Sequence, residues 1–188
     1  MMNLAEYRRT ATRLADFLPW VALVGQGVVL NKDGSFQRSA SFRGPDLDSA
    51  VAAELVGVAA RLNNAFRRLG SGWAIFVEAQ RYPSNRYPDS IFPDPASALL
   101  DAERKADFEE EGAHFESRYV LTFAWLPPAE DAARAETWLY EGRERSGVDP
   151  HEILRAFVDR TDRVLALLHG FMKECRWLDD SETLTYLH

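Results

Sequence analysis

Residues Phe115–Leu126, FESRYVLTFAWL, alternate between apolar and polar side chains more regularly than any other stretch of the chain. In an extended backbone successive side chains point to opposite faces, so a period of two predicts a β-strand with one buried face. The apolar face holds Phe115, Tyr119, Leu121, Phe123 and Trp125, and the opposite face holds Glu116, Arg118 and Thr122. Pro127 and Pro128 end the strand because neither has an N–H to donate.

A β-hairpin is expected near the start of the chain. Val21–Leu30 is rich in β-forming residues, with a loop at Gly25-Gln26-Gly27. The tetrapeptide NKDG at 31–34 predicts a turn, since Gly34 can adopt a positive φ. The second hairpin strand, Ser35–Arg43, places Arg38 among apolar side chains, which suggests a strand end or a sheet edge.

Helical periodicity marks several further segments. Residues 48–69 carry a predicted buried stripe of Val51, Leu55, Val58, Leu62, Phe66 and Leu69. Asp149, Pro150 and Glu152 are typical of a helix start, and the helix should bury Ile153, Phe157, Val164, Leu168 and Phe171. Pro95–Glu111 and Ala129–Tyr140 predict two more helices. Trp73–Arg81 and Cys175–Leu178 predict strands.

In chain order these elements predict an α+β fold. The expected architecture is a ferredoxin-like β-α-β-β-α-β unit with an extra N-terminal strand. A proline-rich and helical insertion, residues 82–114, separates the two middle strands. We expect residues 1–178 to form one domain. Asp179, Asp180 and Glu182 have the spacing of a helix N-cap, so residues 179–188 are expected to begin the segment that leads to a further domain.

Composition excludes several classes of protein. The net charge is −7, and residues 101–188 hold 20 acidic against 11 basic side chains, which argues against binding a phosphate backbone. The most apolar run, 17–30, is too short for a membrane span, and no signal peptide is recognisable. The single cysteine, Cys175, is expected to be a buried, inert thiol in a reducing compartment.

Residue patterns for catalysis or metal binding are missing from the sequence. The four histidines, His114, His151, His169 and His188, lack the paired spacing of zinc ligands. No Gly-x4-Gly-Lys loop occurs, so the sequence shows no recognisable binding site for nucleotide phosphates. We therefore predict no catalytic, cofactor-binding or metal-binding residue in these 188 residues, and no cofactor.

The aromatic strand has two interpretations. Tyr119, Phe123 and Trp125 could stack on bases, as in an RNA-binding sheet. Alternatively the stripe packs under helices as core, which the acidic charge of this half favours.

Several strings resemble one known family along essentially the whole chain. They are LAEYRR at 4–9, LADFLPW at 14–20, VLNKDGSF at 29–36, FRGPDL at 42–47, YPDS at 87–90, FPDP at 92–95 and WLDDSETL at 177–184. In this order they resemble the N-terminal region of TrbE-type conjugal transfer ATPases of the CagE/TrbE/VirB family.

The resemblance implies a non-catalytic domain of a type IV secretion ATPase that acts in conjugation. In that family ATP and Mg²⁺ bind a motor domain outside the region matched here. The N-terminal domain is associated with docking to inner-membrane secretion subunits, notably a small membrane-spanning protein, so assembly with them or self-association is the implied function. The implied location is cytoplasmic, at the periphery of the inner membrane. The alternative is a nucleic-acid-binding module of the transfer apparatus.

The first twenty residues are the candidate docking element. Their apolar and basic sides suit an acidic partner or an anionic membrane surface. The candidate residues are Arg8, Arg9, Arg13, Leu14, Phe17, Leu18 and Trp20. The competing interpretation is that the segment packs across the sheet as part of the core.

Overall fold

A computed structural model describes residues 14–84, 86–110, 114–128 and 150–188. Its elements are α1 (Leu14–Phe17), β1 (Trp20–Gly25), β2 (Val28–Asn31), β3 (Phe36–Arg43), α2 (Ala52–Phe66), β4 (Trp73–Pro83), α3 (Pro95–Glu110), β5 (Phe115–Trp125), α5 (Pro150–His169), β6 (Glu174–Trp177) and α6 (Asp180–Leu187). The predicted helix 129–140 lies outside the described residues.

The strands form one antiparallel sheet, which confirms the α+β class. Its order is β1-β2-β3-β5-β4, and β6 pairs with the free part of β3 beside β2. The hairpin turn lies where the sequence placed it, with Gly34 at a φ of 81°. Two strands, not one, precede β3, because Gly27 at a φ of 65° reverses the chain between β1 and β2. The whole sheet is therefore more than a simple ferredoxin-like arrangement.

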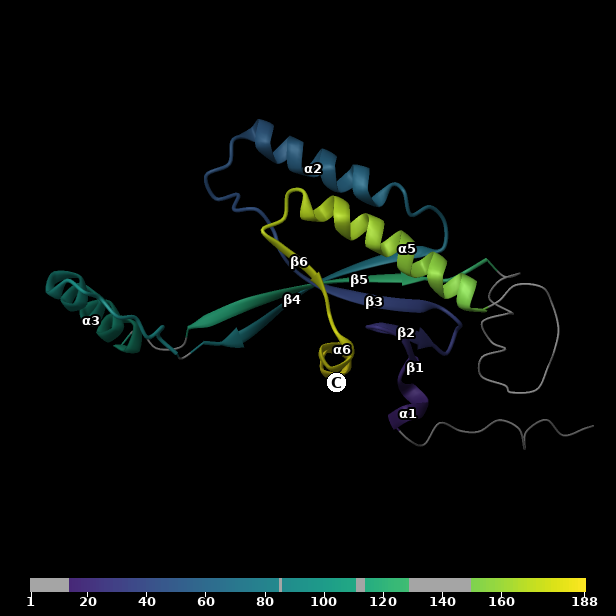
Figure 1. Cartoon of the computed structure of the whole chain (residues 1–188), viewed down its shortest axis with the longest axis horizontal. Helices are drawn as coiled ribbons and strands as arrows, with labels where there is room; N and C mark the ends of the chain where they lie inside the picture. The colour runs from purple at the N-terminus through teal and green to yellow at the C-terminus, as the bar shows by residue number, and fades with distance from the viewer. Residues whose placement is uncertain (1–13, 85, 111–113, 129–149) are drawn as a thin grey trace, which may run out of the picture.

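Helices cover both faces of the sheet. α2 and α5 lie on one side and α6 on the other (Figure 1). Between the sheet and the first two helices, Phe123 of β5, Leu168 of α5 and Ala65 of α2 are fully buried. A second cluster joins Phe36, Trp125 and Phe157 in a stack of aromatic rings. The aromatic strand is thus core over Phe123 and Trp125, whereas Tyr119 remains 40% exposed.

Arg38 is internal rather than at a strand end or an edge, so that expectation was wrong. It lies between Val28 of β2 and Phe123 of β5. Its guanidinium donates to the Asp162 carboxylate at 2.7 Å and lies 4.0 Å from the centre of the Trp177 ring. A charge with an ionic partner and an aromatic face can occupy a position that otherwise demands an apolar side chain.

The stripe on α2 is buried only at its C-terminal end. Ala65 and Leu69 are buried, and Leu62 and Phe66 pack partly on the core. Val51 is 61% exposed and Leu55 45% exposed, contrary to the expectation for both residues. The N-terminal turns of α2 therefore pack less closely on the core than its C-terminal turns.

The predicted insertion becomes an arm. The distal halves of β4 and β5 continue past the other strands and carry α3 away from the rest of the molecule (Figure 1). No α3 side chain is buried. Its residue Phe108 packs against two rings outside the helix. The Tyr87 ring contacts it edge-on, and the His114 ring stacks on it with the ring centres 3.7 Å apart.

The C-terminal residues fold back onto the sheet. Asp179 and Glu182 form the reciprocal capping box that the sequence predicts at the start of α6. Thr183 is buried, and the Tyr186 hydroxyl donates to the Glu78 carboxylate of β4. Among the described residues, no helix has the length and apolarity needed to cross a bilayer.

Candidate interaction surface

The N-terminal docking candidates are described from Leu14 onward. Leu14 is 74% exposed and Phe17 is 70% exposed, both on the single turn of α1. Leu18 and Trp20 are half-buried, and Trp20 opens β1 opposite Asn31. Arg8, Arg9 and Arg13 lie outside the described residues. The structure therefore places an exposed apolar pair immediately before a sheet strand.

The hairpin turn between β2 and β3 holds this segment in place. The Lys32 backbone N–H donates to the Pro19 carbonyl at 2.7 Å, and its ammonium donates to the Asp16 carbonyl at 3.0 Å. The turn itself is tightened by Asp33, which accepts from both the N–H and the hydroxyl of Ser35. The sequence indicated Lys32 only as a turn residue. Its role in fixing α1 depends on a contact across 16 residues, which no local pattern reveals.

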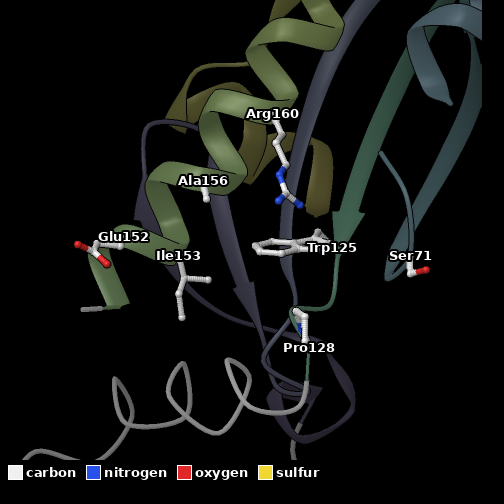
Figure 2. A pocket seen from close by; sticks show the side chains of 7 residues that line it. All are labelled: Ser71, Trp125, Pro128, Glu152, Ile153, Ala156 and Arg160. Carbon is white, nitrogen blue, oxygen red and sulfur yellow. The ribbon is translucent and has the colours of Figure 1, made fainter. Parts of the chain in front are cut away.

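A shallow pocket of about 290 Å³ lies where β5 meets the start of α5. In Figure 2 the Arg160 side chain lies over the Trp125 ring, with its guanidinium carbon 5.5 Å from the ring centre. The Glu152 carboxylate and the Ser71 hydroxyl point away from that pair. Acid–base or nucleophilic catalysis requires groups that converge on one reacting atom, and these side chains do not.

A larger notch, about 710 Å³, opens at the root of the arm. Its charged side chains are Arg43, Glu116, Arg118 and Glu174. Two basic and two acidic side chains line it, so it offers no concentrated field for a phosphate or a cation.

A reactive thiol and a metal site are two further possibilities for chemistry. Burial raises the pKa of the Cys175 thiol to about 11, so the sulfur stays protonated and is a poor nucleophile. Within the described part of the chain, no three histidine, cysteine, aspartate or glutamate side chains gather as metal ligands would. The exposed apolar surfaces are therefore the features that point to a function.

Comparison with known proteins gives a consistent result. The model of the family described as the N-terminal domain of the type IV secretion system ATPase VirB4/TrbE matches residues 27–133. The conjugal transfer protein TrbE of Rhizobium radiobacter is 39% identical over 161 residues, which cover 84% of this chain and 20% of that protein.

A second relative is matched over most of its own length. It is the first piece of a probable conjugal transfer protein TrbE of Sinorhizobium fredii (strain NBRC 101917 / NGR234), and it is 42% identical over 130 residues. The match covers 68% of this chain and 87% of that protein. The chain thus spans about a fifth of one relative and most of the other.

Proposed function

This chain belongs to the family of VirB4/TrbE type IV secretion ATPase N-terminal domains, and from that premise we propose that it is a non-catalytic assembly domain. It would join the ATPase to inner-membrane secretion subunits, at the cytoplasmic periphery of that membrane, and to further copies of itself. In conjugation, the transfer of DNA–protein complexes and pilus assembly would be powered by ATP and Mg²⁺ bound elsewhere.

The observation that carries the docking proposal is the presentation of Leu14 and Phe17. Two large apolar side chains, 74% and 70% exposed, lie on a turn that Lys32 fixes to the sheet. Apolar side chains exposed on a fixed element are typical anchors for a partner protein, because burying them on binding removes apolar area from water. This arrangement favours the docking interpretation over packing across the sheet.

The test is co-purification of the longer ATPase with its small membrane-spanning partner. Replacing Leu14 and Phe17 together by serine should reduce the captured partner at least about tenfold, since two anchors are lost. The matched control replaces Leu99 and Leu100 of α3, 64% and 59% exposed, by serine. Equal capture by the Leu14/Phe17 variant and the parent would overturn the docking role.

The absence of catalysis is tested separately with the 188-residue chain. These residues contain no Gly-x4-Gly-Lys loop to supply backbone N–H groups and a lysine to phosphates. We expect isothermal titration with ATP and Mg²⁺ to give no binding heat. One-site micromolar binding would contradict a purely assembling domain.

The nucleic-acid alternative gains little support. A base-stacking sheet needs exposed aromatic side chains on a basic surface. Phe123 is fully buried and Trp125 is 6% exposed, and the chain is acidic overall.

We also propose that β3 to β6 constitute a ferredoxin-like unit. β3 and β4 flank β5, and β5 and β6 flank β3. The connection between the strands of each flanking pair contains a crossing helix, α2 for the first pair and α5 for the second. Two interleaved β-α-β units of this kind are what a split βαβ fold requires.

A further inference from the structure

The outer edge of β4 is a long stretch of backbone that no other described strand pairs with. β4 lies at one end of the sheet and is bonded only to β5, through eleven residue pairs from Trp73–Trp125 to Pro83–Phe115. The register is unbroken along this whole length.

Two hydrogen bonds fix which backbone groups face outward. Leu126 donates its N–H to Gly72, and Ser84 donates its N–H to His114. Both bonds follow the register of the β4–β5 ladder, so the even-numbered residues between them also bond to β5. The odd-numbered residues, among them Ile75, Val77, Ala79 and Arg81, must direct their N–H and C=O groups away from β5.

This edge lacks the features that usually prevent pairing with another strand. Most edge strands carry a bulge, a proline or an inward-pointing charge, which hinders pairing with a strand of another chain. The opposite edge of the sheet, β1, has two register shifts. β4 has none, its proline comes only at position 83, and Phe76 and Val77 are 58% and 66% exposed beside the free groups.

We propose that a second copy of this chain pairs with β4 in antiparallel fashion, with Ala79 opposite Ala79 of the second copy on the two-fold axis. This deepens the self-association part of the proposed function and rests on it. Val77, Ala79 and Arg81 then exchange backbone hydrogen bonds with Arg81, Ala79 and Val77 of the second copy, and the two sheets become continuous.

The side chains favour this register and make β4 complementary to itself. On the face that carries α6, Phe76 meets Tyr82 of the second copy, an aromatic cross-strand pair, and Glu78 meets the neutral amide of Gln80. On the other face the aliphatic stem of Arg81 lies along Val77.

The neighbouring registers are poorer. A two-fold axis at Glu78 sets two carboxylates opposite each other, which is unfavourable. An axis at Val77 sets Glu78 opposite Phe76 and loses the aromatic pair. An axis at Gln80 sets Phe76 opposite Ser84 and also loses the aromatic pair.

Cysteine cross-linking of the 188-residue chain tests the register directly. Opposed residues in a hydrogen-bonded antiparallel pair have Cα atoms about 5.5 Å apart, within the range of a disulfide. Ala79→Cys should therefore form a disulfide-linked dimer under mild oxidation. Arg81→Cys is the matched control, because the two copies of residue 81 would be offset by four residues, about 13 Å along the strands.

The parent chain controls for the native thiol. Cys175 is buried and should give no dimer under the same conditions. No dimer from Ala79→Cys, or equal dimer from Arg81→Cys, would overturn the proposal.

A second variant removes one outward donor without touching the β4–β5 ladder. Val77→Pro deletes an N–H that β5 does not use, so the fold should persist by circular dichroism. Sedimentation velocity between about 1 and 300 μM brackets a micromolar dissociation constant. The parent should pass from monomer to dimer and Val77→Pro should stay monomeric.

A parent chain that stays monomeric throughout would refute the self-pairing. Capture of the membrane partner through Leu14 and Phe17 would be unaffected by that result. The two proposals can therefore fail independently.

Discussion

At the level of single residues, Gly27 connects the first hairpin to the C-terminal helix. Its φ is 65°, its N–H donates to the Asp180 carboxylate at 2.7 Å, and an added Cβ would lie 2.4 Å from the Leu178 carbonyl oxygen. Gly27→Ala should cost more than about 1 kcal/mol of unfolding free energy, because both the backbone and the close contact resist it.

The matched control is Gly57→Ala in α2, where an added Cβ meets no atom within 4 Å. There alanine should stabilise by about 0.5–1 kcal/mol, because it has the higher helix propensity. Urea unfolding of both variants shows whether the free energy of unfolding falls for Gly27→Ala and rises for Gly57→Ala. A Gly27→Ala variant as stable as the parent would contradict the close contact between residue 27 and the Leu178 carbonyl oxygen.

Glu182 provides a pH-dependent contact at the same scale. The Arg176 guanidinium donates to both carboxylate oxygens at 2.7 Å, and the Asp179 N–H donates at 3.1 Å. These bonds, that of Arg176 first, lower the pKa of Glu182 from 4.5 to about 2. A carboxyl whose pKa is lower in the folded than in the unfolded chain stabilises the fold at any pH above its unfolded pKa. This contribution of Glu182 should therefore be lost as the pH falls from 4.5 towards 2.

Arg176→Gln tests the cause of that shift. We expect the midpoint of the Glu182 carboxyl, followed by carbon-13 NMR, to rise from about 2 towards 4.5, and to stay below it while the Asp179 N–H bond remains. An unchanged midpoint would show that the guanidinium is not the main cause.

At the level of elements, the helical periodicity of α2 predicts which face of the helix is buried but not how much of its length is buried. The apolar stripe correctly identified the face that packs, since Leu62 and Phe66 lie against the core. It could not indicate how far the covered sheet extends, and Val51 and Leu55 therefore remain exposed. Burial at the ends of a helix depends on the elements beneath it, which are distant in sequence.

Leu62→Asp and Arg61→Asp test this packing. Leu62 contacts the core, so an unpaired carboxylate there should cost several kcal/mol and could unfold the chain. Arg61 is exposed, and its replacement should change stability by about 0.5 kcal/mol or less. Thermal melts compare the two, and equal melting temperatures would refute the assignment of the helix face.

At the level of the whole molecule, the sequence predicted the strands and the crossing helices from local patterns alone. It missed the internal position of Arg38, which depends on contacts with Asp162 and Trp177 of distant elements. The exposed edge of β4 was equally invisible, because strand order is set by pairing across the chain rather than by any single segment.

The two ends of the chain should therefore respond differently to truncation. Deleting residues 179–188 removes the buried Thr183, the Asp180 acceptor of Gly27, and the Tyr186 hydroxyl that bonds Glu78. Because 1 kcal/mol corresponds to roughly 2–4 °C for a chain of this size, the loss of several kcal/mol should lower Tm by about 10 °C or more.

Deleting residues 1–18 should instead leave Tm within a few degrees, because Leu14 and Phe17 are exposed and α1 is a single turn. Differential scanning calorimetry at equal protein concentration distinguishes the two truncations. A large loss from the N-terminal deletion would mean that this segment belongs to the core rather than to a docking surface, since exposed anchors contribute to binding a partner and not to folding.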